Sequence, residues 1–484
     1  MSERLFEVDA DASVGEPVRP ACGGKRFIEL PGRGQMSLQV RCIEDFVPAG
    51  APVRALDEIM SRLDYSGFER HFPGGGRPAW PPMLLAKVVL FAYSQGVRSA
   101  REIARRLESD LRLMWLAQEQ RIDHQRLSEF RRRFARELAE LFVQTVRLAE
   151  EMGLVDLGLV ALDGSKVAAS ARRRAVDEDT LRRQISQVLA EAEAVDAAED
   201  AQLGEARGDE LPSELRDPRR RLEKLQRALE ALEASGQQQV AINDPEAPLQ
   251  KTTGGLRPGY NLQIAVDQHH GMIVAQDVTD AQNDTEQLRG MLEQTIANTG
   301  AKPALTVADA GYHSGDSLAA VAEQEVEAYI AQRSAPEPQA DRFGPDDFEY
   351  DADGDEFICP RGKRLSYRRD KQHGGAVQRV YATRHADCRG CPLRARCLSP
   401  RGKRRELFVM AHAHLLREMR QRLDSDEGRQ AMRLRRQVVE PVFGTLKAVL
   451  GLRQFLLRGL EGARVELSLA ATAFNLRKLA AAAA

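Results

Sequence analysis

Two aspartates, Asp163 and Asp309, each close an apolar stretch that is predicted to form a buried strand. An acid in such a position is costly to bury unless it binds a partner. Both aspartates lie near predicted strand ends, where open α/β sheets place their functional sites. The alternative for Asp163 is a strand-end turn with Gly164, because Asp-Gly is a frequent turn pair.

A third acid, Glu440, stands within a basic segment close to the C-terminus. On a helix, Arg436 and Glu440 would be i, i+4 neighbours, and Lys447 would lie on the same face. The alternative is an ordinary ion pair on a surface helix. Pro441 and Gly444 indicate a kink or a helix start near Glu440. The bases of the segment are Arg433, Arg435, Arg436 and Lys447.

These residue types suit phosphodiester chemistry. Carboxylates that lie close together repel each other unless a cation joins them, and Mg²⁺ prefers oxygen ligands. Two such ions about 4 Å apart can activate a water molecule or a 3′-hydroxyl and stabilise the leaving oxygen. Arginines and lysines nearby would hold the flanking phosphates.

The elements that must position the acids follow from hydrophobic periodicity. Strands are predicted over residues 159–167, 260–267, 272–279, 304–312 and 327–331, with helices over 285–296 and 317–325. This order predicts a mixed α/β sheet entered by a hairpin. The chain is predicted to be helical from Leu407 to its end.

The region 53–152 has a helical pattern, and within it residues 128–136 contain the basic run Arg131–Arg133. Residues 99–107 resemble the first helix of a helix-turn-helix, which would place a helix against a DNA groove. The alternative is a small helical bundle with a basic face.

Two segments interrupt this order. Residues 171–237 are charged and almost free of aromatic residues, which predicts an inserted solvated helix or helical hairpin. The second segment, 335–405, contains four cysteines in the spacing C-x28-C-x2-C-x5-C. Four thiolates would suit tetrahedral zinc, and free reduced thiols are the alternative. The four cysteines are Cys359, Cys388, Cys391 and Cys397.

The charge distribution favours a polyanionic partner although the net charge is only −2. Residues 361–405 carry fifteen arginines and lysines against two acids, and segregated basic blocks neutralise phosphates locally. The sequence has no apolar run of 18 residues and no apolar leader segment, so neither a membrane span nor secretion is expected. Six cysteines in so long a chain do not indicate a disulfide framework. A cytoplasmic protein associated with the nucleoid is expected.

The sequence resembles the DDE transposases of bacterial insertion sequences. The resemblance rests on A-L-D-G-S-K around Asp163, A-D-A-G-Y-H-S around Asp309, and the C-terminal helix. That helix matches the family signature Tyr-x2-Arg-x3-Glu-x6-Lys at Arg436, Glu440 and Lys447, and departs from it only at its first position, where Arg433 stands.

The resemblance implies a ribonuclease-H-like catalytic core. Asp163, Asp309 and Glu440 would be the acids that bind Mg²⁺ or Mn²⁺. The bases Arg433, Arg436, Lys447 and Arg458 would contact DNA. His313 is either an assisting residue or a solvated loop histidine; residues 283–284 are candidate phosphate contacts or supporting residues. Glu466 is the rival for the third acid, but it lies in an apolar helix without clustered bases.

The resulting expectation is an α/β protein: a ribonuclease-H-like mixed sheet flanked by helices, with an all-α N-terminal domain and two insertions. The predicted division is an N-terminal arm (1–45), a helical DNA-binding domain (46–153), a charged helical insertion (171–237), a basic cysteine-containing insertion (335–405), and a core built from 154–170, 238–334 and 406–484.

The expected function is a transposase that binds terminal inverted repeats, cleaves the element ends and joins the 3′ ends to target DNA. The family implies a homodimer, because two ends must be joined together. The alternatives are a metal-dependent nuclease of the same fold, a DNA-binding derivative without catalysis, and a zinc-dependent structural or regulatory module.

Overall fold

The computed structural model describes residues 42–72, 79–171, 175–203, 213–252, 255–332, 342–351, 353–373, 376–410 and 412–483. Most of the predicted N-terminal arm lies outside these residues.

The chain is a mixed α/β protein built around a six-stranded sheet, counted over the described residues, in the order β2-β3-β1-β5-β6, with β4 paired to β3. Its strands are β1 (Val160–Ala168), β2 (Leu249–Thr252), β3 (Gly255–Asp267), β4 (Ile273–Thr279), β5 (Leu305–Ala308) and β6 (Glu327–Ile330). Helices α10 (Gln287–Thr299) and α11 (Gly315–Glu323) connect the strands, as predicted. The mixed sheet entered by a hairpin is therefore confirmed.

Two strands of this sheet determine where the aspartates meet. Strand β1 pairs with β5 in parallel, and the last pair of the ladder is Leu162 with Ala308. The next residue on each strand is an aspartate, Asp163 or Asp309. Strand β5 stops at Ala308, four residues before the predicted end. Strand β1, by contrast, continues to Ala168 along β3, so Asp163 lies inside the strand predicted over 159–167 and not in a strand-end turn, which was the alternative.

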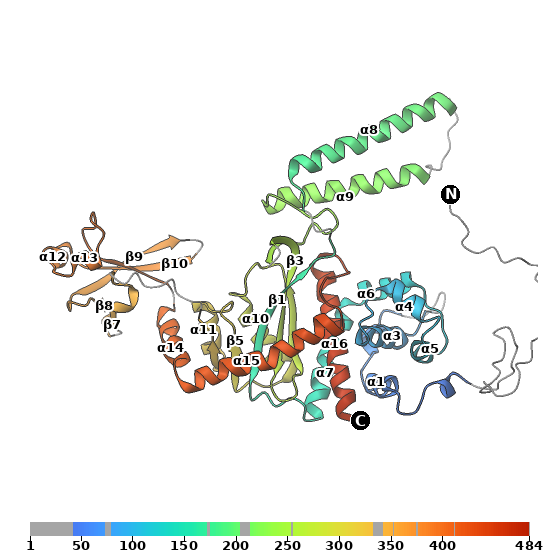
Figure 1. Ribbon diagram of the computed structural model, residues 1–484, viewed down its shortest axis with the longest axis horizontal. Coiled ribbons are helices and arrows are strands. Elements are labelled where there is room, and N and C mark those ends of the chain that lie inside the picture. The colour runs from blue at the N-terminus through green and yellow to red at the C-terminus, as the bar shows by residue number, and fades with distance from the viewer. Residues whose placement is uncertain are drawn as a thin grey trace, which may run out of the picture. The chain divides into compact units, whose positions relative to one another are not determined.

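A long helix, α15 (Asp426–Gly444), passes β1 and β5 and carries the basic segment (Figure 1). The predicted helix start near Glu440 is wrong, because α15 continues through Pro441. Pro441 and Gln437 are both exposed, so water can satisfy the Gln437 carbonyl that loses its amide partner. The helix widens directly afterwards into a π-helical turn, η3 (Thr445–Val449).

The N-terminal helices share one hydrophobic core with the sheet and with the closing helix α16 (Gly459–Ala483). They are α1 (Pro52–Ser61), α2 (Ser66–Glu69), α3 (Pro82–Ser94), α4 (Ala100–Arg106), α5 (Leu111–Leu116), α6 (His124–Arg133) and α7 (Ala135–Glu151), preceded by the 3₁₀ turn η1 (Ile43–Phe46).

Within this region, Arg131 is not available to DNA. It is buried and donates hydrogen bonds to the Tyr93 hydroxyl and the Arg98 carbonyl.

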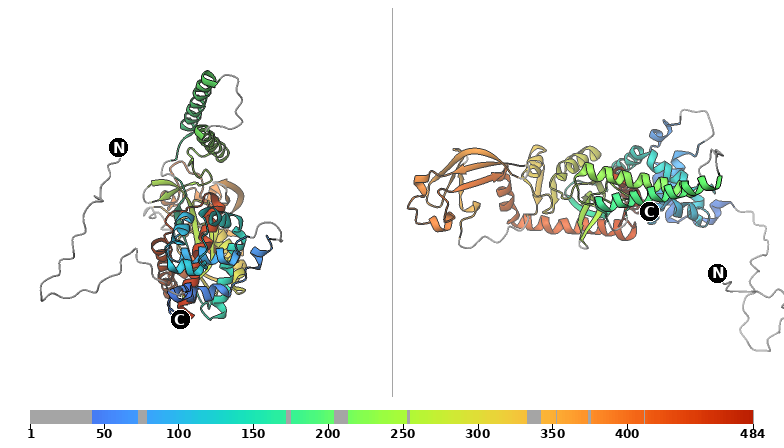
Figure 2. Two further views of the ribbon diagram at one scale, coloured as in Figure 1. Left: turned by 90° about the vertical axis from the view of Figure 1, so that its right-hand side faces the viewer. Right: turned by 90° about the horizontal axis from the view of Figure 1, so that it is seen from above.

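The first insertion is a helical hairpin of α8 (Glu178–Leu203) and α9 (Ser213–Ser235), as predicted. The two helices pack side by side and bury a small core of their own, which includes Leu181 and Leu232 (Figure 2).

The second insertion forms an antiparallel sheet in the order β11-β10-β9-β8-β7. Its last strand corrects the helix that we predicted from Leu407, since residues 406–410 pair with β10. Helix α14 (Ala413–Leu423) begins only after this strand. The other elements are the 3₁₀ turn η2 (Pro345–Asp347), the strands β7 (Glu349–Asp351), β8 (Glu356–Ile358), β9 (Arg364–His373), β10 (Ala376–Ala382) and β11 (Glu406–Met410), and the short helices α12 (His385–Cys388) and α13 (Arg394–Cys397).

None of the helices in the described part of the chain is long and apolar enough to cross a membrane.

A buried ion pair joins the N-terminal helices to the last helix. Glu466 is fully buried and accepts hydrogen bonds from the Arg98 guanidinium and from the backbone N–H groups of Leu456 (2.7 Å) and Leu457 (3.1 Å). Arg98 also donates to the Gly451 and Gln454 carbonyls. The buried ion pair and these hydrogen bonds therefore explain why an acid stands at position 466, and they remove the reason to consider Glu466 a catalytic acid.

We predict that Arg98→Ala destabilises the protein by about 3 kcal/mol, because it leaves the Glu466 carboxylate buried without its cation. The measurement is the free energy of unfolding from denaturant titration. The matched control is Arg105→Ala, which removes an exposed pair with Glu102 and should change stability little. Equal losses of unfolding free energy in Arg98→Ala and Arg105→Ala would contradict a stabilising role for the Arg98–Glu466 ion pair.

Candidate active site

Asp163 is the most constrained of the three acids. Its side chain is 18% exposed; one carboxylate oxygen accepts from the Gly164 N–H (2.8 Å) and the other from Arg435 Nη1 (2.9 Å). The pKa of Asp163 is raised to about 6: burial is the largest cause, the charge of Arg435 opposes it, and the neighbouring charge of Asp309 adds to it. The two aspartates therefore affect each other electrostatically, as the strand register requires.

Asp309 begins the turn that follows β5. Its Oδ1 accepts from the Gly311 N–H at 2.8 Å, and the carboxylate is half-buried. Tyr312, at the end of this turn, is fully buried and donates its hydroxyl to Gln263 Oε1 on β3. Burial raises the pKa of Tyr312, and nearby carboxylates, Asp163 and Asp309 among them, raise it further. The tyrosine thus remains a neutral donor that holds the turn against the sheet.

Arg435 is the functional candidate that sequence reasoning missed. Its side chain is only 14% exposed, and its ion pair with Asp163 joins α15 to β1. The predicted residue, Arg436, is instead exposed, as is Arg433. A signal for Arg435 was present, because it falls in the apolar stripe of α15 with Ala431 and Val438, and a base in such a stripe requires an acidic partner.

Lys447 approaches the same strand from η3 and donates to the Ser165 hydroxyl. Burial lowers the pKa of Lys447, while the charge of Asp163 raises it. Asp163 and Ser165 lie on one face of β1 because successive side chains alternate. Helix α15 with its π turn therefore places two cations, from Arg435 and Lys447, along that face.

Glu440 lies on α15 between these two bases and is exposed. Within the described residues its carboxylate takes part in no side-chain hydrogen bond or ion pair. Its place as the third acid therefore stays a prediction. Arg458 is exposed near Asp244, whose pKa is raised by burial although the charge of Arg458 acts to lower it. His313 is half-buried in the turn after Asp309, so it is not a fully solvated loop histidine.

Over the described parts of the chain, no group of three or more His, Cys, Asp and Glu side chains is gathered so that it could hold an ion. The Arg435–Asp163 ion pair explains in part why no such group is gathered, because Arg435 supplies the positive charge at Asp163 that a metal cation would supply. Asp309 has no such basic partner among the described ion pairs, and its carboxylate fits a hard cation.

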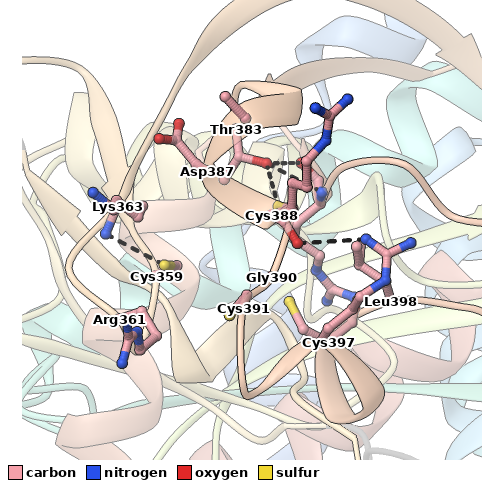
Figure 3. Close-up of a pocket in the computed structure, with 14 residues that line it drawn as sticks. Cys359, Arg361, Lys363, Thr383, Asp387, Cys388, Gly390, Cys391, Cys397 and Leu398 are labelled. Atoms are coloured by element: carbon pink, nitrogen blue, oxygen red, sulfur yellow. Dashed lines mark hydrogen bonds between the residues drawn. The ribbon is translucent and has the colours of Figure 1, made fainter.

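The four cysteines of the second insertion surround one cavity of about 260 Å³ (Figure 3). All four are free thiols. Cys359 Sγ accepts from the Lys363 N–H at 3.3 Å, and Cys388 Sγ lies 3.1 Å from the Thr383 hydroxyl. Burial raises the pKa of Cys397, and the other three cysteines raise it as well. The four cysteines predicted from the sequence thus line one cavity, but their sulfur atoms are not gathered closely enough to form a metal site.

Two protein-family models match this sequence. Residues 358–480 match the transposase DDE domain, a range that runs from the cysteine insertion through Glu440 to the last helix. Residues 41–133 match a transposase domain (DUF772), which covers the N-terminal helices through α6. No curated protein matches the chain.

Both matches describe transposase domains, and they fall on the two ends of one continuous fold. The two matches support an insertion-sequence DDE transposase. Members of this class act on DNA and generally use a divalent metal ion. Asp163 and Asp309 lie outside both matched ranges, so their assignment depends on the geometry of β1 and β5.

We predict that the apparent pKa of Asp163 responds to its two charged neighbours in opposite directions. Arg435→Gln should raise it above about 6, because the favourable charge is lost, and Asp309→Asn should lower it. The measurement is an infrared titration of the carboxyl stretch, taken as the difference between each protein and its Asp163→Asn derivative. A titration unchanged by both substitutions would contradict the described contacts.

The raised pKa of Asp163 also makes the stability of the folded protein depend on pH. The folded-state pKa of about 6 lies above the ordinary aspartate value of 3.8, so the folded protein binds this proton more tightly than the unfolded chain. The contribution of Asp163 to stability is therefore most favourable below pH 4 and decreases as the pH rises through 6.

Proposed function

We propose that the protein is a metal-dependent DNA transposase with a ribonuclease-H-like core. It binds the terminal inverted repeats of its element, hydrolyses the phosphodiester bonds at the element ends and joins the freed 3′ ends to target DNA. The observation that supports this most directly is the β1–β5 register, which makes Asp163 and Asp309 neighbours beside a helix that carries Arg435 and Lys447.

Asp163, Asp309 and Glu440 are the proposed acids of the site. A bound Mg²⁺ or Mn²⁺ would polarise the scissile phosphate and lower the pKa of the attacking water or hydroxyl. The side chains have separate tasks. Asp163 and Asp309 present oxygen ligands from adjacent strands, and Glu440 completes the set when the exposed face of α15 is covered by DNA.

The bases on α15 would position the DNA backbone. In the described state, Arg435 neutralises Asp163, and we propose that it turns to a phosphate when a cation takes its place. Lys447, held at Ser165, would contact a neighbouring phosphate. Arg433 and Arg436 are exposed on the same helix, and Arg458 is exposed on the segment before α16; these three are proposed as outer phosphate contacts.

The remaining predictions on organisation are part of the same proposal. The helical segment 46–153 would bind the terminal repeats, the basic insertion 335–405 would add DNA contacts, and two copies of the chain would join two ends as a homodimer. Association with the nucleoid would follow from the DNA binding.

We predict that Asp163→Asn, Asp309→Asn and Glu440→Gln each reduce cleavage of element-end DNA by at least about 100-fold, because each removes an oxygen ligand. DNA binding should persist, since the basic residues remain. The measurements are gel-based cleavage with Mg²⁺ or Mn²⁺ and filter binding, both on the DNA that flanks the coding sequence.

Glu427→Gln is the matched control, because it removes an exposed acid from the first turn of the same helix. Normal cleavage by Glu440→Gln would remove Glu440 from the site. Cleavage without joined products in a two-end reaction would favour the nuclease, and DNA binding that is indifferent to Mg²⁺ and to Asp163→Asn would favour the inactive derivative.

We further propose that Cys359, Cys388, Cys391 and Cys397 bind a structural zinc ion. The support is their common cavity, the N–H donated to Cys359 Sγ, and the bases that would balance thiolate charge. The bases that line the cavity are Arg361, Lys363, Arg389, Arg394 and Arg405.

We predict that the purified protein contains about one zinc per chain, and that Cys391→Ser removes it. The measurement is metal content by mass spectrometry, combined with limited proteolysis of the insertion. Cys42→Ser is the control, because this exposed cysteine lies outside the cluster. A metal-free protein whose four thiols react freely would establish the alternative of reduced thiols.

A further inference from the structure

A fourth carboxylate, Asp284, lies beside the proposed site on the segment that leads into α10. Its surroundings are defined by two glycines, each of which follows one of the proposed catalytic aspartates in the sequence. These are Gly164, directly after Asp163, and Gly311, two residues after Asp309. At both positions a side chain would collide with the Asp284 carboxylate.

At Gly311 the space that a Cβ atom would fill is bounded by two acids. That position lies 2.7 Å from Asp284 Oδ2 and 2.8 Å from Asp309 Oδ1. The two carboxylate oxygens therefore approach one point from different segments of the chain. Two like charges at such a separation repel each other unless a cation or a proton lies between them.

At Gly164 the corresponding position lies 2.8 Å from Asp284 Oδ1 and 2.7 Å from Gln263 Nε2. Gly164 and Lys166 point to the face of β1 opposite Asp163 and Ser165. Asp284 thus reaches the site from the side of the sheet opposite α15, and the missing side chain of Gly164 makes room for it.

The Asp284 carboxylate is held rigidly at one of its two oxygens. Oδ1 accepts from Asn261 Nδ2 (2.5 Å) and Gln263 Nε2 (2.6 Å), and both of these β3 residues are fully buried. The next residue, Thr285, is anchored through its carbonyl by the hydroxyls of Ser314 (3.1 Å) and Ser317 (2.9 Å). Within the described residues, Oδ2 accepts no hydrogen bond.

Alternative explanations for this acid are weaker. A helix cap would use the carboxylate to accept from backbone N–H groups, whereas only the Asp284 carbonyl is used, by the Gln287 N–H. An ion pair would place a base within reach of Oδ2, but none of the described ion pairs involves Asp284. Lys166 interacts with Asp284 electrostatically, whereas its ammonium donates to the Gln282 carbonyl at 2.9 Å. Oδ2 therefore faces Asp309 across the space at Gly311.

We infer that Asp284 holds a divalent cation together with Asp309, with Oδ2 and Asp309 Oδ1 as its two protein ligands. Mg²⁺ is commonly bound by one or two carboxylates, with water and substrate phosphate completing its coordination, so a two-carboxylate site suffices. This inference rests on the proposed function and adds an acid, opposite α15, to the three already assigned.

The test measures Mn²⁺ binding to the full-length protein through the electron paramagnetic resonance signal of free Mn²⁺. The measurement needs neither DNA nor an active protein. Asp284→Asn keeps an oxygen that can accept from Asn261 and Gln263, and therefore keeps the fold. We expect Asp284→Asn to weaken Mn²⁺ binding by about 10–100-fold, and Asp309→Asn to weaken it at least as much. Asp280→Asn, an exposed acid earlier in the same segment, should bind like the unmodified protein.

A second variant probes the geometry directly. Gly311→Ala places a methyl group between the two carboxylate oxygens and should also abolish tight Mn²⁺ binding. Gly290→Ala is its control, because a Cβ there meets nothing within 4 Å. Thermal unfolding and circular dichroism would verify that each variant is folded.

The outcomes separate this inference from the proposed function. If Asp284→Asn and Gly311→Ala bind Mn²⁺ normally while Asp309→Asn does not, the role of Asp284 is overturned and the proposed metal site stands. If the unmodified protein binds no Mn²⁺, the metal chemistry of the proposed function fails and this inference fails with it.

Discussion

The candidate site depends on the register between two short strands. The parallel ladder of β1 and β5 ends with the pair Leu162 and Ala308, and the chain continues on both strands with an aspartate. Because the pairing fixes Cα positions, neither acid can move away from the other without breaking backbone hydrogen bonds in a buried sheet. The raised pKa of Asp163 is a physical consequence, since both burial and Asp309 disfavour its charge.

Helix α15, its π turn and strand β3 supply cations and hydrogen-bond donors that stabilise the carboxylates of the site. On one face of β1, Arg435 and Lys447 approach from α15 and its π turn. On the other face, buried amides from β3 hold Asp284 in the space left by two glycines. The carboxylates of the site therefore have bases on the α15 side of β1 and hydrogen-bond donors from β3 around Asp284. A polyanion and divalent cations would complete the charge balance of such an arrangement.

Strands β1, β3, β4, β5 and β6, the two connecting helices and the helical hairpin could be predicted because each shows clear periodicity or composition, whereas the short strand β2 was not predicted. Asp163 and Asp309 could be found because an acid beside a buried apolar stretch is costly. Arg435 was missed because helical spacing drew attention to Arg436 and Glu440, whereas the partner of Arg435 lies 272 residues away. The strand at 406–410 was assigned to a helix because a short apolar run fits both structures, and only its pairing with β10 decides. The π turn after Pro441 and the enclosure of Asp284 are tertiary features that no local pattern encodes.

The proposed function requires that residues of strands β1 and β5 and of helix α15 together bind a divalent cation. Fe²⁺ can be used in place of Mg²⁺ in the full-length protein bound to element-end DNA, and added ascorbate and peroxide then generate radicals that cut the protein backbone near the ion. We predict cuts close to Asp163, Asp309 and Glu440 that excess Mg²⁺ suppresses. Cuts confined to other segments, or a pattern that leaves α15 intact, would contradict it.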